Sequence, residues 1–260
     1  VTKHGWVAVT SDYIGLGTKG PHPYLVGDAE ARNVWDASKA VLGFDAVKVS
    51  TDTVIWGHSQ GGQGSLWTGQ IASSYAPEFT VKGIVAFAPA SDLYALAEAI
   101  KTETAGKTVS AYIAATWDRV FPELEVEKNL TPGSAGPVER IGGLCFNGHD
   151  GLAAILRGSQ VPNQIFPNTL LGGPFGGEKL KEQEPTGPFP RPAAGRAGSR
   201  GSAREARDPA RLGAGGALRR RHPDRLPHVS GPRARGARRA GLAAHAPQLE
   251  QWTLDRWDGK

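Results

Sequence analysis

The sequence predicts an α/β fold with a mostly parallel sheet, and three observations support this. Residues 53–56 and 81–88 are short apolar runs rich in β-branched side chains, which are typical of buried strands. Residues 28–43 and 63–74 place apolar side chains at helical spacing. The two kinds of segment alternate along the chain, as they do in parallel sheets that are covered by helices on both faces.

The N-terminal part is expected to begin with a strand over residues 5–11 (GWVAVTS). After a glycine-punctuated loop, the helix over 28–43 is predicted to have Asp28 as its N-cap and Gly43 as its stop. Because the chain starts without Met and already within a strand pattern, we expect it to begin inside a domain. No signal peptide is readable in it, and no run is long and apolar enough to span a membrane.

Residues 57–61 (GHSQG) join a predicted strand to a predicted helix. A G-x-S-x-G sequence in that context is typical of a nucleophile elbow, in which a serine sits on a very tight turn. We expect Gly57 and Gly61 to be required because the turn leaves no room for side chains. Ser59 is then the candidate nucleophile, and the N–H of Gln60 is the candidate oxyanion donor at the helix N-terminus. A glycine-rich turn with an idle serine is the alternative.

The second half of the chain is predicted to add a helical insertion to the sheet. Helices are expected at 92–100 and 110–121, within a block at 91–165 that has few strand patterns. After a sheet strand, such a block is interpreted as a cap or lid over the active site, with ordinary crossover helices as the alternative. The chain then divides into a core with the elbow at 1–90, this cap, and the remainder of the core at 166–260.

The net charge of +5 comes from one segment of the chain. Residues 190–241 hold 14 of the 30 Lys and Arg residues and three acidic residues, which leaves 16 basic and 22 acidic residues elsewhere. Arg, Ala, Gly and Pro dominate residues 191–247 without a persistent period, as in a basic disordered segment that binds nucleic acid. Cys145 is the sole cysteine, so it gives no disulfide framework and fits a reducing compartment or a lost partner.

Five segments of the first 190 residues resemble the secretory lipase family of α/β-hydrolases, a group of microbial extracellular lipases and esterases. They are residues 11–17 (SDYIGLG), 21–27 (PHPYLVG), 57–62 (GHSQGG), 74–78 (SYAPE) and 88–93 (APASDL). The resemblance implies a fragment of the α/β-hydrolase fold, a secreted protein, and a Ser/Asp/His triad with Ser59 as nucleophile. Family members also carry an N-terminal region with further strands and a second oxyanion donor, and we expect residues 1–260 not to include that region.

The triad acid and base should follow Ser59 in the order Asp, His. In the sequence as written, the candidates are Asp208 and His228. All the acidic and histidine residues of this region lie in arginine-rich surroundings without a strand pattern. The others are Asp224, His222 and His245.

Residues 191–247 also have the composition of a GC-rich gene read out of frame. Back-translated and read one base later, they permit two apolar strands, the first ending in G-L-A-D and the second in a histidine-bearing loop. Strands of this kind carry the acid and base in the family. We interpret the segment as a frameshift near Pro190 that is reversed near Pro247, and we expect the written residues to be disordered. The aspartate codon would overlap residues 201–202, and the histidine codon would overlap residues 234–235.

The other polar candidates are interpreted as structural. His58 is expected to pack beside the elbow, His22 to belong to a loop, and His149 to lie in the cap. Asp12 and Asp92 follow strands, where carboxylates often cap loops or helices. No Cys/His spacing indicates a metal, and no cofactor is expected.

The resulting functional prediction is a serine carboxylic-ester hydrolase that forms an acyl-enzyme on Ser59. Its substrate would be an ester or a triacylglycerol at a lipid–water interface. Two alternatives remain: other acyl chemistry on the same fold, as in a peptidase or an acyltransferase, and a non-enzymatic, arginine-rich nucleic-acid binder.

Overall fold

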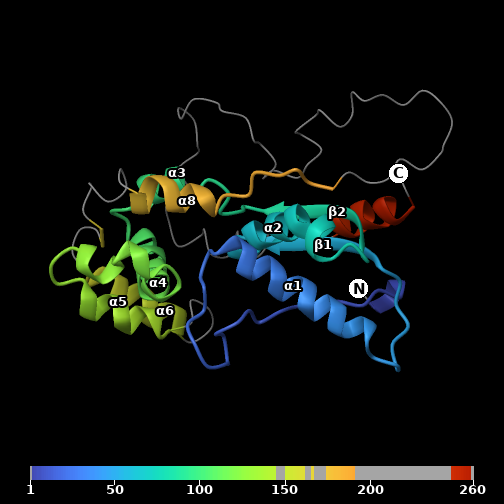
Figure 1. The fold of residues 1–260 in the computed structure, drawn as a ribbon, viewed down its shortest axis with the longest axis horizontal. Helices are drawn as coiled ribbons and strands as arrows, with labels where there is room; N and C mark the ends of the chain where they lie inside the picture. The colour runs from blue at the N-terminus through green and yellow to red at the C-terminus, as the bar shows by residue number, and fades with distance from the viewer. Residues whose placement is uncertain (1, 145–149, 162–164, 167–173, 191–246, 259–260) are drawn as a thin grey trace.

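The computed structural model describes residues 2–144, 150–161, 165–166, 174–190 and 247–258 (Figure 1). The elements in chain order are η1 Thr2–His4, α1 Gly27–Leu42, β1 Asp52–His58, α2 Gln60–Tyr75, β2 Thr80–Phe87, α3 Leu93–Ile100, α4 Thr104–Val120, η2 Pro122–Leu124, η3 Val126–Asn129, α5 Ala135–Gly142, α6 Asp150–Ser159, η4 Pro174–Lys179, α8 Leu180–Glu182 and a C-terminal helix over residues 247–257. The expectations for residues 191–246, including the frameshift and the disorder, lie outside the described residues.

The described sheet consists of β1 and β2, which run parallel. Their register pairs Asp52 with Thr80 at one end and His58 with Phe87 at the other, with one irregularity between Thr53 and Val54. The predicted parallel sheet and the strand–helix alternation are therefore confirmed for these elements.

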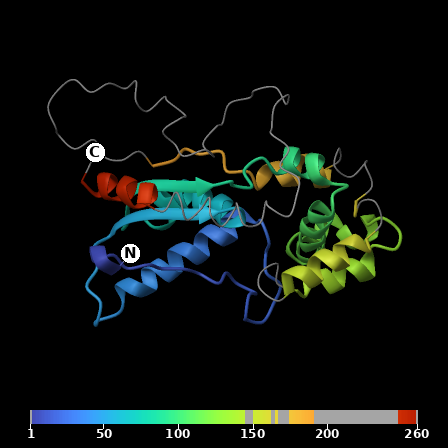
Figure 2. The same cartoon turned by 180° about the vertical axis from the view of Figure 1, so that it is seen from behind.

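Helices cover both faces of this sheet. Helix α2 packs against both strands, and a Cβ placed on its Gly69 would overlap the side chain of Ile84 in β2. A Cβ placed on the neighbouring Gly83 would instead overlap the ring of Trp252 in the C-terminal helix. Successive residues of a strand point to opposite faces, so α2 and the C-terminal helix lie on opposite sides of β2. Figure 2 shows the C-terminal helix at the end of the sheet away from helices α3 to α6.

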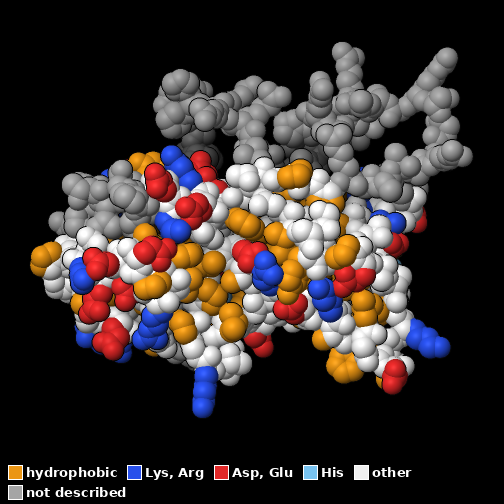
Figure 3. Space-filling model, in the orientation of Figure 1, with side chains coloured by type: hydrophobic (Ala, Val, Ile, Leu, Met, Phe, Trp, Pro, Cys, Tyr) orange, Lys and Arg blue, Asp and Glu red, His pale blue; other side chains and the backbone are white. Residues whose placement is uncertain are grey.

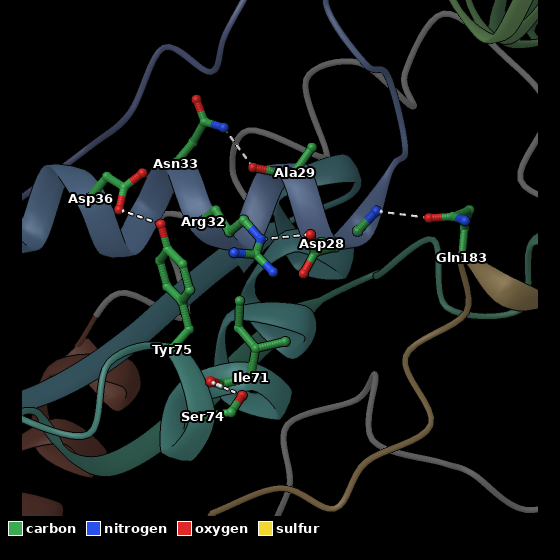
Figure 4. Close-up of polar contacts among 10 residues, drawn as sticks. Asp28, Ala29, Arg32, Asn33, Asp36, Ile71, Ser74, Tyr75 and Gln183 are labelled. Carbon is green, nitrogen blue, oxygen red and sulfur yellow. Dashed lines mark hydrogen bonds and ion pairs between the residues drawn. The ribbon is translucent and has the colours of Figure 1, made fainter. Parts of the chain in front are cut away.

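Helix α1 packs on α2 through apolar and polar contacts. The fully buried Trp35 donates its indole N–H to the carbonyl oxygen of Thr68 at 2.8 Å. At the surface of the same contact, the Tyr75 hydroxyl donates to Asp36 at 2.7 Å (Figure 4). Helix α1, which precedes Ser59 in the chain, is therefore fixed against helix α2, which follows Ser59.

Helix α1 begins one residue earlier than predicted, and Asp28 is not its N-cap. Val26 holds the N-cap position without a side-chain cap, and the side-chain oxygen of Gln183 accepts a hydrogen bond from the N–H of Gly27 at 3.2 Å (Figure 4). Asp28 lies in the first turn and pairs with Arg32 at 2.7 Å. A distant side chain thus supplies the cap that local sequence assigned to Asp28. The predicted stop at Gly43 is confirmed.

The helices after β2 gather at one end of the molecule (Figure 1). Helix α4 contacts α3, α5 and α6, and its Trp117 is fully buried and donates its indole N–H to the Tyr24 carbonyl oxygen at 2.8 Å. The predicted helices at 92–100 and 110–121 are confirmed as α3 and α4, and α4 begins six residues earlier than predicted. The interpretation of this block as a cap remains a prediction.

The predicted strand at 5–11 is wrong. In the described part of the chain these residues pair with neither β1 nor β2, and Val7 and Val9 are exposed. The segment is held through Trp6, whose ring stacks on Trp257 at 5.0 Å and meets Trp56 edge-on at 6.4 Å. A strand needs a partner for its backbone hydrogen bonds, and aromatic packing alone holds the segment beside the sheet without a ladder.

Candidate active site

Ser59 has a backbone conformation that is rare for a residue with a side chain. It lies between β1 and α2 with φ 57° and ψ −116°, and it is exposed. Positive φ brings the Cβ of an L-residue close to its own backbone, and such residues cost about 1–3 kcal/mol each. The surrounding contacts must therefore hold Ser59 in place.

The backbone of Ser59 is tied to the residues that follow both strands. Its N–H donates to the Phe87 carbonyl oxygen at 2.9 Å. Its carbonyl oxygen accepts from the N–H groups of Gln63 at 3.1 Å and Ala90 at 3.3 Å. The end of β2 and the first turn of α2 thus fix the serine at the carboxyl edge of the sheet.

The three glycines around Ser59 have different roles. A Cβ on Gly57 would overlap the Gly61 carbonyl, and a Cβ on Gly62 would lie 2.9 Å from Cα of Pro89. A Cβ on Gly61 would meet nothing within 4 Å. The expectation that Gly57 must lack a side chain is confirmed, but the one for Gly61 is wrong, because its Cβ direction faces open space.

Two polar groups at this turn are free for a ligand. Within the described residues, neither the Ser59 hydroxyl nor the N–H of Gln60 makes a hydrogen bond. Gln60 is the first residue of α2, where backbone N–H groups lack helical partners and the helix dipole is positive. When a carbonyl carbon is bonded to Ser59 Oγ, the anionic oxygen on that carbon would meet such a donor.

The side chain of Gln60 points into a polar cluster behind the turn. Its amide nitrogen lies 2.8 Å from both Glu30 Oε1 on α1 and His22 Nε2 in the preceding loop. Glu30 is 1% exposed, and this burial raises the pKa of its carboxyl to about 8, although hydrogen bonds from Gln60 and Leu25 act in the opposite direction. Burial also lowers the pKa of His22, against a smaller opposite effect of its hydrogen bond to Ile14.

Sequence reasoning missed Glu30 as part of this site. The signal was present, because Glu30 lies on the same helical face as the buried residues Gly27, Ala31 and Trp35. A glutamate within a buried helical stripe is unusual and needs partners.

The structure gives mixed outcomes for the other candidates. His58 is exposed, so its predicted packing role is wrong, because its side chain at the end of β1 points to solvent. Asp92 accepts a hydrogen bond from the Ala95 N–H at 2.9 Å and caps α3 as expected, while His22 lies in a loop as expected. Asp12 is exposed. The remaining candidates lie outside the described residues: His149, Asp208, His222, Asp224, His228 and His245.

Two further searches cover only the part of the chain that the structure describes. No group of three or more His, Cys, Asp or Glu side chains there is placed to hold a metal ion. No helix there combines the length and the apolar character needed to cross a bilayer.

The amino-terminal part of the chain is similar to one known family. Residues 1–126 match the model of the secretory lipase family. The match includes the elbow and confirms the resemblance seen in the sequence motifs. Among curated proteins, the chain is 33% identical over 112 residues to a secreted triacylglycerol lipase of Malassezia globosa, a match covering 40% of this chain and 24% of that protein. It is 33% identical over 91 residues to a Mycobacterium tuberculosis protein named "probable inactive lipase", which covers 34% of this chain and 20% of that protein.

Solved structures support the fold. Candida antarctica lipase A superposes with a TM-score of 0.51 at 16% identity, over 63% of this chain and 38% of the lipase. A Legionella pneumophila protein described as a hydrolase gives a TM-score of 0.52 at 16% identity, over 70% of this chain and 51% of that protein. The chain therefore carries a fragment of the α/β-hydrolase fold, and it spans about a fifth to a quarter of the curated lipases that it matches.

Proposed function

We propose that the chain is part of a serine carboxylic-ester hydrolase, a lipase or esterase that works outside the cell and forms an acyl-enzyme on Ser59. The secretory lipase match and the hydrolase fold support ester hydrolysis in general. The Malassezia relative is named a secreted triacylglycerol lipase, which favours a triacylglycerol or another ester as substrate.

The backbone of Ser59 is the observation that carries the proposal. A serine at φ 57° and ψ −116° costs stability, and three backbone hydrogen bonds together with the absent side chain of Gly57 keep it there. A glycine-rich turn with an idle serine has no need of this conformation. Strain that the fold maintains at an exposed hydroxyl is typical of a nucleophile elbow.

The proposed reaction uses two groups of the described turn. The Ser59 hydroxyl oxygen attacks the ester carbonyl carbon while a base accepts the hydroxyl proton, and the N–H of Gln60 donates to the oxyanion that forms. Collapse of this intermediate breaks the bond to the alcohol, which leaves with the proton and gives the acyl-enzyme. Water then attacks the acyl carbon in the same way and releases the acid and free Ser59.

The acid and base of this reaction belong to the part of the chain after residue 190. In the sequence as written, Asp208 and His228 are the candidates. In the shifted frame, the aspartate codon overlaps residues 201–202 and the histidine codon overlaps residues 234–235. Sequencing the gene across codons 188–250 separates the two possibilities, and an uninterrupted reading frame would refute the frameshift.

We further propose that α3 to α6 form a cap that meets the substrate. Leu152, Ile155 and Leu156 are exposed along one side of α6, with spacing that places them on a common helical face. An apolar helix face on a cap suits contact with acyl chains or with a lipid–water interface.

Two alternatives have separate tests. The same turn serves peptidases and acyltransferases, and a panel of matched ester and amide substrates distinguishes these activities from ester hydrolysis.

The nucleic-acid alternative depends on the arginine-rich stretch, which lies outside the described residues. On the described face that Figure 3 shows, acidic and basic side chains are interspersed. Salt-dependent retention on DNA or RNA would support that alternative.

The direct test is labelling with a fluorophosphonate, which reacts covalently with activated serines. In any active form of the protein, peptide mass spectrometry should find the label on Ser59, and Ser59→Ala should abolish it. Ser74→Ala is the matched control, because Ser74 is also exposed on α2 but has an ordinary helical backbone and donates its hydroxyl to the Ile71 carbonyl oxygen (Figure 4). Labelling that persists in Ser59→Ala would refute the assignment.

A further inference from the structure

One assignment of protons satisfies the hydrogen bonds of the polar cluster behind the elbow. The Gln60 amide has two hydrogens, and it lies 2.8 Å from Glu30 Oε1 and 2.8 Å from His22 Nε2. His22 Nε2 can accept only if that nitrogen carries no proton. The other ring nitrogen, Nδ1, then carries the proton and donates to the Ile14 carbonyl oxygen at 3.1 Å. A neutral histidine therefore completes the cluster.

The carboxyl of Glu30 uses its two oxygens differently. Oε1 accepts from Gln60 and, at 3.2 Å, from the Leu25 N–H. Oε2 is buried and has no hydrogen-bond partner among the described residues. A Cβ built on Gly64 of α2 would lie 3.0 Å from this oxygen and 2.6 Å from the Tyr13 hydroxyl, so the glycine leaves the space that the carboxyl occupies. A buried carboxylate oxygen without a partner would carry uncompensated charge, so burial favours the protonated carboxyl.

We propose that Glu30 is a positioning residue for the Gln60 oxyanion donor and that it fulfils this role as an uncharged carboxylic acid. The inference rests on the proposed function of Ser59 and Gln60. Glu30 holds the side chain of Gln60 from behind the turn, so that the backbone N–H of the same residue keeps its direction beside the Ser59 hydroxyl. Gln60 carries both groups: its side-chain amide binds Glu30, and its backbone N–H is the proposed oxyanion donor.

Charge explains why the neutral form is the working form. The titratable groups packed around Glu30 are Tyr13, His22 and Tyr24 of the preceding loop, and burial raises the pKa of both tyrosines and lowers that of His22. None of them carries positive charge at neutral pH, and the α2 residues Gln60 and Gly64 are uncharged. An ionised Glu30 would thus be an unpaired buried anion next to the site where an oxyanion forms, and like charges in a poorly solvated site repel strongly.

The test compares the chain with Glu30→Gln, which keeps the shape and the accepting oxygen but cannot ionise. The rate of Ser59 labelling by a fluorophosphonate is measured for both proteins from well below to well above the Glu30 pKa of about 8. At low pH the two rates should agree. At high pH the unmodified chain should be slower by about tenfold or more, since loss of one oxyanion donor costs on the order of a hundredfold. A ratio that stays constant with pH would overturn the proposal.

A second readout separates this inference from the proposed function. Folding raises the Glu30 pKa, so between the ordinary value of 4.5 and about 8 only the folded chain keeps the proton. The free energy of unfolding should therefore fall with rising pH across this window, relative to Glu30→Gln, and level off above it. Absence of Ser59 labelling in a form of the protein that has a working acid and base, with this pH dependence intact, would refute the proposed function alone. Absence of the pH dependence would refute the buried neutral carboxyl.

Discussion

The elbow half and the helical half of the described molecule are held together in different ways. In the described residues the sheet side has a small apolar cluster of five buried residues: Trp35, Ile55, Ala72, Ala76 and Val81. The helical side has a cluster of fifteen buried residues centred on α4, and it reaches Leu25 and Val26 just before α1. The region with the candidate nucleophile therefore has the smaller apolar core.

Polar contacts and close backbone approach take the place of apolar packing around the elbow. Buried Gln63 and half-buried Trp67 of α2 both donate to the carbonyl oxygen of Gln183, at 2.8 and 2.9 Å. The side-chain oxygen of Gln70 accepts from the N–H groups of Thr186 and Gly187, each at 2.8 Å. Residues 183–187 thus run along α2 as a strap (Figure 1). The turn at Ser59 therefore depends on steric fit, whereas helices α3 to α6 depend on buried volume.

The largest effect is expected from Gly57→Ala. Its new Cβ would overlap the Gly61 carbonyl, so the turn must open, and we expect a loss of about 4 kcal/mol or more in stability together with loss of Ser59 labelling. Gly61→Ala is the matched control. Its Cβ has open space in a helix, so stability should change by about 1 kcal/mol or less. Denaturant unfolding measures both, and equal effects would contradict a steric basis for the elbow.

Two tryptophan variants compare the two clusters. Trp35 and Trp117 are both fully buried, and each donates its indole N–H at 2.8 Å, so either substitution by Ala should cost about 3–5 kcal/mol. Trp35→Ala should also lower Ser59 labelling, because Trp35 packs between α1 and the elbow helix. Trp117→Ala should raise amide exchange in α4 and leave labelling largely intact. Equal loss of labelling in both variants would show that the halves unfold as one unit.

Sequence patterns predicted those elements whose determinants are local. The strands around 53–56 and 81–88, the strand–serine–helix context of Ser59 and the cap of α3 by Asp92 are all readable from neighbouring residues. The start of α1 could not be read from neighbouring residues, because its cap comes from Gln183, far along the chain. The strand at 5–11 failed since extended patterning does not supply a hydrogen-bonding partner. Glu30 was missed because its burial arises where α1, α2 and the 13–25 loop meet.

A smaller effect separates a true cap from an acidic residue in a first turn. Asp92→Ala removes the hydrogen bond to the Ala95 N–H and should destabilise the chain by about 1 kcal/mol, while Asp92→Asn should retain most of it. Asp28→Ala removes only the exposed pair with Arg32 and should cost about 0.5 kcal/mol or less. Thermal unfolding of the three variants gives the comparison, and a larger cost at Asp28 would restore it as the N-cap of α1.

We propose that the chain has a nucleophile turn at Ser59 and lacks a working acid and base in its written sequence. The most direct measurement is kcat/KM for a short-chain ester, compared with an intact secretory lipase under the same conditions. We expect the written chain to be slower by about 10⁴-fold or more, because loss of a single triad partner already costs on that order. Turnover within tenfold of the intact enzyme would contradict the account, and it would make Asp208 and His228 the working acid and base.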